Sequence, residues 1–373
     1  MRNDANAVAV LKDRKDRIFE VDAVKFMAIF YMICEHVYER FGSFDYFGKM
    51  PDTLYRNFVE FFGGPMAAPV FMFCMGIGMI YTRHDSSADF IRRGIKLLLA
   101  GYLLNFFRQT IPMLIAMRLG IDTGFSLIGG LLNVDILPFA GMAFISIGLM
   151  KRFKMPLLSM LATAILLQAV GIWSVNLRID SVAAATLIGL ILPGGDHVAF
   201  PMTLWLIYPV SGMIFGRFLK QSGDRVSLYK KVLAVSFVFF VSYSSALLFS
   251  GYDLRLIYSL YKSSYYNQNI MSVMWIIPLV LMSICISYFV LGRICLTVTG
   301  RFMTYCSINL MTIYMIQWLL IGYGLGFYML LGFGPTDSPL FLISGALVLM
   351  ILSVAIMTLI RKVRSIRRAK LSK

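Results

Sequence analysis

The sequence predicts an all-α, polytopic membrane protein, and three observations support this fold class. Of the 373 residues, 59% are hydrophobic and only 14% are charged, whereas a soluble domain has roughly 25% charged residues. Apolar runs of about 20 residues, long enough to cross a bilayer as helices, fill nearly the whole chain. The lysine and arginine residues behind the net charge of +16 collect in short segments between these runs and at the C-terminus.

Ten apolar runs are predicted to cross the membrane. They lie near residues 21–41, 58–82, 94–118, 128–150, 156–174, 199–219, 229–250, 270–292, 304–331 and 339–361. An eleventh run, residues 182–193, is too short and is predicted to be re-entrant or half-length, which a bilayer tolerates only where protein or a water-filled cavity covers the backbone. We expect one transmembrane domain, residues 17–361, between an N-terminal segment, residues 1–16, and a basic tail, residues 362–373.

The distribution of basic residues orients the predicted helices. When the ten runs cross and the N-terminus is cytoplasmic, most lysines and arginines fall in cytoplasmic segments, as the positive-inside rule requires. If residues 182–193 also crossed, the basic segment 217–231 and the basic tail would both move outside. We therefore expect both termini in the cytoplasm and the tail against anionic lipid. This bias accounts for the net charge without nucleic acid, and no nucleic-acid partner is predicted.

Short polar motifs add little to this outline. The five cysteines have neither zinc-site nor disulfide spacing, so free thiols and no metal are expected. The sequence starts without a signal peptide and lacks N-x-S/T acceptors, which favours the cell membrane of a prokaryote. In "GMIFG", Gly212 and Gly216 favour a close contact between helices. The sequence leaves the oligomeric state open, a homodimer included.

The first predicted helix carries charged groups where an apolar span has none. Asp22, Lys25 and His36 lie in it, although a charge near the bilayer centre costs about 2.5–3.5 kcal/mol on insertion scales. Lys25 and His36 are eleven residues apart, which on a helix places them within about 20° of each other and about 16 Å apart along the axis. Asp22 can pair with Lys25. One shared face predicts a polar passage; alternatively, these residues flank a short span and reach the two interfaces.

The order of several motifs resembles the transmembrane acyltransferase superfamily, which includes the acyltransferase-3 and heparan-α-glucosaminide N-acetyltransferase-like proteins. The first motif is Asp22, Lys25 and His36, with lysine where the family has arginine. An apolar span and a basic R-x-x-R element follow, here Arg93-x-x-Lys96. The blocks "VDILPFAGMAFISIGLMKRF", "FPMTLWLIYPVSGMIFGRFL" and "TGRFMTYCSINLMTIYMIQWLLIG" come next. The resemblance covers residues 17–325.

This resemblance implies transfer of an acyl group, usually acetyl, from cytoplasmic acyl-CoA to a hydroxyl or amine of a cell-surface or lipid-linked glycan. It implies a catalytic set of His36 with Asp22 and Lys25. Arg92, Arg93 and Lys96 lie at the mouth of a helix, where basic groups and the helix N-terminus favour the phosphates of CoA. Ordinary positive-inside topology is the alternative reading of that cluster. Lysine lacks the bidentate fork of arginine, which bears on donor binding at both substituted positions.

Further polar residues could complete the site. His36 is the histidine predicted within a span, and histidine can act as a base or a nucleophile near neutral pH. Asp135 enters its span on the outer side and could share the vestibule. Tyr314 and Gln317 lie three residues apart and could bind the acyl carbonyl or the acceptor, although hydrogen bonding between helices explains them equally well. His84 and His197 are expected to be solvated or structural.

A transporter or flippase with a cationic lumen is the alternative function, because a basic passage suits either activity. The enzyme hypothesis requires a continuous cavity from Arg93 and Lys96 to His36. It also requires that acyl-CoA binds and is consumed.

Overall fold

Every regular element in the described part of the chain is a helix. The computed structural model describes residues 17–42, 53–120, 126–194, 197–260, 263–336 and 338–371, and within these ranges it contains two isolated bridges but no strand. The prediction of an all-α protein is confirmed. In the same ranges, eight helical segments are long and apolar enough to cross a membrane.

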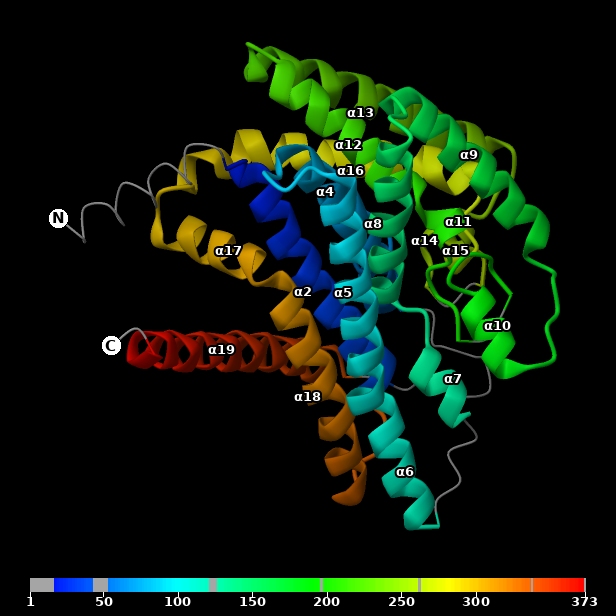
Figure 1. The fold of residues 1–373 in the computed structure, drawn as a ribbon, viewed down its shortest axis with the longest axis vertical. Coiled ribbons are helices and arrows are strands. Elements are labelled where there is room, and N and C mark those ends of the chain that lie inside the picture. Colours follow the sequence, from blue (N-terminus) through cyan, green and yellow to red (C-terminus); the bar gives the residue numbers. More distant parts are fainter. Residues whose placement is uncertain are drawn as a thin grey trace.

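Figure 1 shows the order of the helices along the chain. The first half contains α2 (Phe19–Phe41), α3 (Leu54–Gly63), α4 (Ala68–Tyr81), α5 (Ser87–Asn105), the π-helix η1 (Phe106–Thr110), α6 (Ile111–Arg118), α7 (Leu127–Leu132), α8 (Ile136–Arg152), α9 (Leu157–Ser174) and α10 (Val182–Ile188). The second half contains α11 (Met202–Trp205), α12 (Ile207–Gln221), α13 (Arg225–Phe249), α14 (Arg255–Tyr258), α15 (Ser263–Tyr266), α16 (Ile270–Leu291), the 3-10 helix η2 (Gly292–Ile294), α17 (Val298–Ile308), α18 (Leu310–Leu330) and α19 (Pro339–Leu371).

Eight of the ten predicted spans coincide with the segments suited to crossing a membrane, and two do not. Helix α2 is long enough to cross but carries several charged residues. Helix α8 has 17 residues, which is slightly too short. Non-helical residues also interrupt predicted span 58–82 at 64–67 and predicted span 128–150 at 133–135. The segment around 182–193 contains α10, a helix of seven residues, as expected for a half-length element. Predicted span 304–331 is broken at Asn309, between α17 and α18. Helices α5, η1 and α6 run on as one helical segment.

Helix α2 is the central element of the fold. It contacts α3, α4, α16, α17, α18 and α19, and Figure 1 shows it crossing the middle of the molecule beside α4. Val21 and Val24, near its start, pack in one core cluster with side chains of α4, α8, α12 and α16. Ile29, Ile33 and Val37 pack in a second cluster with α18 and α19. Both ends of α2 are thereby fixed by tertiary packing.

Helices α4 and α12 cross with their backbones in close contact. A Cβ atom at Gly76 would lie 1.9 Å from the backbone oxygen of Pro209, and one at Gly212 would lie 2.0 Å from the backbone oxygen of Phe73. Only glycine fits at such a distance, because real Cβ contacts are longer. The close contact predicted from "GMIFG" is confirmed at Gly212.

The outer helices expose large apolar side chains. On α13, Val235, Phe237, Val238 and Phe249 are between 55% and 92% exposed, and Leu347, Val348 and Ile351 are exposed on α19. Apolar surface of this extent is not left to water in a soluble monomer. Lipid tails satisfy it, which agrees with a protein that spans the membrane several times.

Candidate active site

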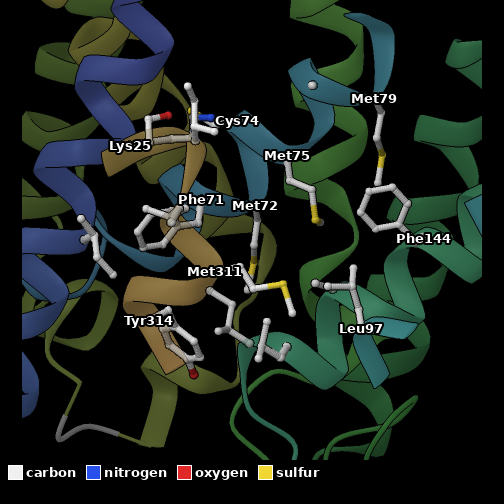
Figure 2. A pocket seen from close by; sticks show the side chains of 18 of the residues that line it. Lys25, Phe71, Met72, Cys74, Met75, Met79, Leu97, Phe144, Met311 and Tyr314 are labelled. Atoms are coloured by element: carbon white, nitrogen blue, oxygen red, sulfur yellow. The ribbon is translucent and has the colours of Figure 1, made fainter. Parts of the chain in front are cut away.

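A cavity of about 530 Å³ lies between α2, α4, α5, α8, α17 and α18. Arg17, Lys25 and Arg93 contribute basic groups to its lining, and Tyr314 contributes a hydroxyl. Figure 2 shows Lys25 and Tyr314 at opposite ends of this pocket, with methionine side chains between them. The cavity therefore has a basic end and an aromatic end.

The wall between these ends is rich in methionine. Five methionines line it: Met32, Met72, Met75, Met79 and Met311. Figure 2 shows Met72, Met75 and Met311 pointing into the open space. Methionine is unbranched and flexible, so it adapts its shape to an apolar guest. The cavity suits an extended, largely apolar ligand segment that carries negative charge at one end.

The buried carboxylate of Asp22 organises the basic end. It accepts hydrogen bonds from Arg17 Nε and Nη2 at 2.9 and 3.0 Å and from Ser307 Oγ at 2.6 Å. Lys25 Nζ lies 3.6 Å from the same carboxylate, so the predicted pairing is present. Asp22 thus holds two cations in place at the cavity wall.

The three basic residues proposed for the donor occupy different positions. Arg93 lines the cavity, and its guanidinium carbon lies 4.7 Å from the centre of the Phe144 ring. Arg92 and Lys96 are exposed and are absent from the described lining. The structure therefore brings Arg93 together with Lys25 and Arg17, and leaves Arg92 and Lys96 outside this group.

The imidazole of His36 faces the neighbouring helix α18. His36 Nδ1 lies 3.0 Å from Gln317 Nε2 and 3.3 Å from Gln317 Oε1, and its ring centre lies 4.0 Å from that of Trp318. Gln317 is completely buried. His36 is therefore turned toward protein, although it is absent from the described lining of the cavity.

A buried polar network connects the aromatic end of the cavity with the surroundings of His36. The Asp135 carboxylate accepts a hydrogen bond from Tyr314 Oη at 2.8 Å and lies 2.7 Å from Arg108 Nη2. Its other oxygen accepts from the backbone N–H of Ile136 at 2.7 Å, at the start of α8. The guanidinium carbon of Arg108 lies 4.3 Å from the centre of the Trp318 ring, against which His36 packs.

The predicted residues Asp135, Tyr314 and Gln317 thus lie with His36 in one cluster. Among the described residues, the cavity lined by Arg93 does not reach His36 as expected: its lining extends to Tyr314, whose hydroxyl donates to Asp135, and includes neither Lys96 nor His36. His84, by contrast, is exposed in the connection between α4 and α5, as expected.

Arg108 was missed by the sequence reasoning. It lies in η1, and its side chain is only 3% exposed. An arginine in the middle of an apolar span is a strong signal, because charged groups within spans face a protein interior or a cavity and pair with other groups there. That signal was available in the run 94–118 and could have identified this residue.

No group of three potential ligands from histidine, cysteine, aspartate and glutamate comes together to hold a metal ion in the described ranges. The chemistry of the cluster is that of a histidine, an amide, an arginine–carboxylate pair and two aromatic groups.

The fold and this cluster define a class: a multi-pass membrane protein with a cavity that is basic at one end and ends near a half-buried histidine at the other. Comparison with protein families gives the particular family. The model of the acyltransferase-3 family, described as an acyltransferase domain, matches residues 18–359. The chain belongs to this family, and the resemblance to the transmembrane acyltransferase superfamily is confirmed. No curated protein and no solved structure matches the chain.

Proposed function

We propose that this membrane acyltransferase moves an acyl group, in the simplest case acetyl, from cytoplasmic acyl-CoA to a hydroxyl or amine of a cell-surface or lipid-linked glycan. The observation that carries the proposal is the cavity, which has cations at one end and a hydroxyl next to the His36 cluster at the other. An acyl-CoA has the matching chemistry, with phosphates at one end and a thioester at the other.

The donor would enter at the basic end of the cavity. Arg17, Lys25 and Arg93 would meet its phosphates through charge-assisted hydrogen bonds, and Asp22 keeps the first two of these cations in position. The pantetheine arm would lie along the methionine wall. This orientation places the basic end on the cytoplasmic side, in agreement with the positive-inside rule.

His36 would act as the general base. When Gln317 Oε1 accepts a hydrogen bond from His36 Nδ1–H, Nε2 is the unprotonated ring nitrogen that takes the proton of the acceptor hydroxyl or amine. The acceptor oxygen or nitrogen then bonds to the thioester carbon, whose carbonyl oxygen becomes negatively charged. When the carbonyl re-forms, the carbon–sulfur bond breaks, and the departing CoA thiolate takes the proton from the His36 imidazolium.

Tyr314 stands between the open cavity and His36 in this mechanism. It lines the cavity and donates to Asp135, and Gln317 lies one helical turn further along α18. We propose that a bound donor displaces the Tyr314 side chain, so that the thioester reaches the cluster. A side-chain rotation of this kind needs no rearrangement of helices.

The proposal is tested by purifying wild-type protein, His36→Asn and His36→Ala in detergent and measuring acyl-CoA consumption, together with mass spectrometry of surface glycans from cells that carry each version. Loss of a general base is expected to lower the rate by about 10²–10⁴-fold, with unchanged elution and thermal unfolding. His84→Asn, in an exposed connection, is the matched control.

Two results would contradict the proposal. His36 variants that fold and keep wild-type transfer would remove the histidine from the chemistry. A wild-type protein that neither binds nor consumes acyl-CoA would favour the alternative, a transporter or flippase with a cationic lumen.

A further inference from the structure

Three hydrogen-bond donors are buried next to His36 without a partner in the described part of the chain. They are Arg108 Nε, Arg108 Nη1 and Trp318 Nε1. The side chain of Arg108 is 3% exposed, and Trp318 is 8% exposed. Leaving a buried donor unsatisfied costs about 1–3 kcal/mol, and more for a charged group. Such donors, held in a cluster beside a cavity, point to a ligand that supplies an acceptor atom.

The arrangement around Trp318 places these donors close to the proposed base. The Trp318 ring centre lies 4.0 Å from the His36 ring centre and 4.3 Å from the guanidinium carbon of Arg108. Trp318 therefore contacts both the proposed base and the guanidinium. Asp135 engages the guanidinium through Nη2, whereas the N–H groups of Nη1 and Nε, which point to different sides of the guanidinium, have no partner in the described part of the chain.

The backbone holds Arg108 in this place. Residues 106–110 form a π-helix within an otherwise α-helical segment, a local feature that occurs frequently at functional sites. Tyr323 Oη donates to the backbone oxygen of Phe107 at 2.9 Å. A Cβ atom on Gly322 would lie 3.1 Å from the backbone oxygen of Arg108, so α18 approaches the π-helix closely. Both contacts fix the backbone that carries the Arg108 side chain.

We propose that Arg108 and Trp318 bind the carbonyl oxygen of the transferred acyl group and stabilise its negative charge in the transition state. This inference rests on the proposed acyl transfer and names the residues that would stabilise it electrostatically. Donors fixed in a buried site stabilise developing charge strongly, because they need no reorganisation when the charge appears. Asp135 keeps Arg108 in place without using the whole guanidinium.

In the acyl-transfer step, every bond that forms is matched by a bond that breaks. As the acceptor atom bonds to the thioester carbon and its proton passes to His36, the carbonyl electron pair moves onto oxygen, where Arg108 and Trp318 donate to it. When that pair returns, the bond to sulfur breaks and the thiolate leaves as described above.

A matched pair of donors tests this role: acetyl-CoA and its thiono analogue dithioacetyl-CoA, in which sulfur replaces the carbonyl oxygen. Thiocarbonyl sulfur is a poor hydrogen-bond acceptor. The kcat of the wild-type protein should therefore fall when dithioacetyl-CoA replaces acetyl-CoA, and this fall should be smaller in variants that lack the donors. Arg108→Gln should lower kcat for acetyl-CoA by about 10²–10³-fold, with a donor KM within about threefold of wild type. In Arg108→Gln, the ratio of kcat with acetyl-CoA to kcat with dithioacetyl-CoA should fall toward one.

Trp318→Phe keeps an aromatic ring at this position but removes Nε1–H together with the five-membered ring, so the donor ratio, rather than kcat alone, carries the test if Arg108→Gln does not fold. Removing one neutral hydrogen bond should lower kcat for acetyl-CoA about tenfold and shrink the donor ratio in the same direction. Arg118→Gln, which removes the same charge from an exposed position of the same helical segment, should leave both values at those of wild type.

The outcomes separate this inference from the proposed function. Variants that slow both donors equally and leave the ratio unchanged would show a structural role only and overturn the inference, while acyl transfer by the wild-type protein would stand. Variants whose loss lies entirely in the donor KM would also overturn it. Wild-type protein that transfers from neither donor would contradict the proposed function itself, and the inference with it.

Discussion

Arg108 Nη2 lies 2.7 Å from the carboxylate of Asp135, although the two residues come from different helices and the arginine side chain is only 3% exposed. The same carboxylate oxygen accepts the hydroxyl of Tyr314. Asp135 therefore connects Tyr314, at the end of the cavity, with the guanidinium beside Trp318. It also pairs with the positive charge of Arg108 inside the segment Ser87–Arg118, which is long and apolar enough to cross the membrane.

Asp135→Asn should destabilise the protein by about 3–5 kcal/mol, because it leaves the Arg108 charge buried without compensation. Asparagine still caps α8 through its side-chain oxygen, so loss of the cap would not explain the result. Thermal unfolding in detergent measures the effect. The double variant Arg108→Met with Asp135→Asn should recover most of the stability without recovering transfer. An Asp135→Asn protein that unfolds at the wild-type temperature would show that the pair contributes little.

Gly78→Phe should block the donor site without disturbing the fold. Gly78 lines the cavity, and a Cβ atom there would meet nothing within 4 Å, so the new ring would occupy open space. We expect the donor KM to rise at least tenfold, equivalent to about 1.4 kcal/mol, with unchanged thermal unfolding. Gly324→Phe on α18 also enters open space but outside the cavity, and should leave KM unchanged. Equal donor binding by both variants would argue against this cavity as the donor site.

The basic residues of α5 should differ in their effects on donor binding. Arg93→Gln should raise the donor KM about tenfold or more, since a charge-assisted hydrogen bond contributes about 1.5–3 kcal/mol. Arg92→Gln and Lys96→Gln remove charge outside the cavity lining and should change KM less than about threefold. Steady-state kinetics with varied acyl-CoA measure all three. A larger effect at Lys96 than at Arg93 would place the phosphates elsewhere.

Gly212→Val should disrupt the crossing of α4 and α12. The added Cβ would lie 2.0 Å from the backbone oxygen of Phe73, so the helices must separate, and overpacking of this kind costs about 1–3 kcal/mol or more. We expect a lower yield of monodisperse protein in size-exclusion chromatography and a lower Tm. Gly324→Val adds the same side chain to a helix facing open space, and it should behave as wild type.

The sequence was sufficient where helix geometry alone decides the outcome. The pairing of Asp22 with Lys25 follows from their spacing, and it is present at 3.6 Å. The all-α class follows from the length of the apolar runs that a bilayer requires, and eight helical segments in the described ranges are long and apolar enough to cross a membrane. The family could be identified because the spacing of several motifs survives the lysines at positions 25 and 96.

Sequence reasoning was insufficient where side-chain volume or tertiary contact decides. Arg93 and Lys96 lie three residues apart, yet only Arg93 reaches the cavity, and helix periodicity does not give the depth of neighbouring side chains. Nor does it show that Tyr314 closes the space before His36. Arg108 was missed because its partner Asp135 is distant in sequence, and because an α-helical period does not hold through a π-helix.

The π-helix at residues 106–110 makes the length of this stretch as important as its composition. A π-helix accommodates one more residue per turn than the α-helical ladder on either side, so it sets a rotational offset between α5 and α6. Deletion of one residue here would restore a regular α-helical ladder and remove the extra residue that the wider turn accommodates around Arg108. The cluster around Trp318 therefore depends on the additional residue in this turn, and a point substitution leaves the number of residues unchanged.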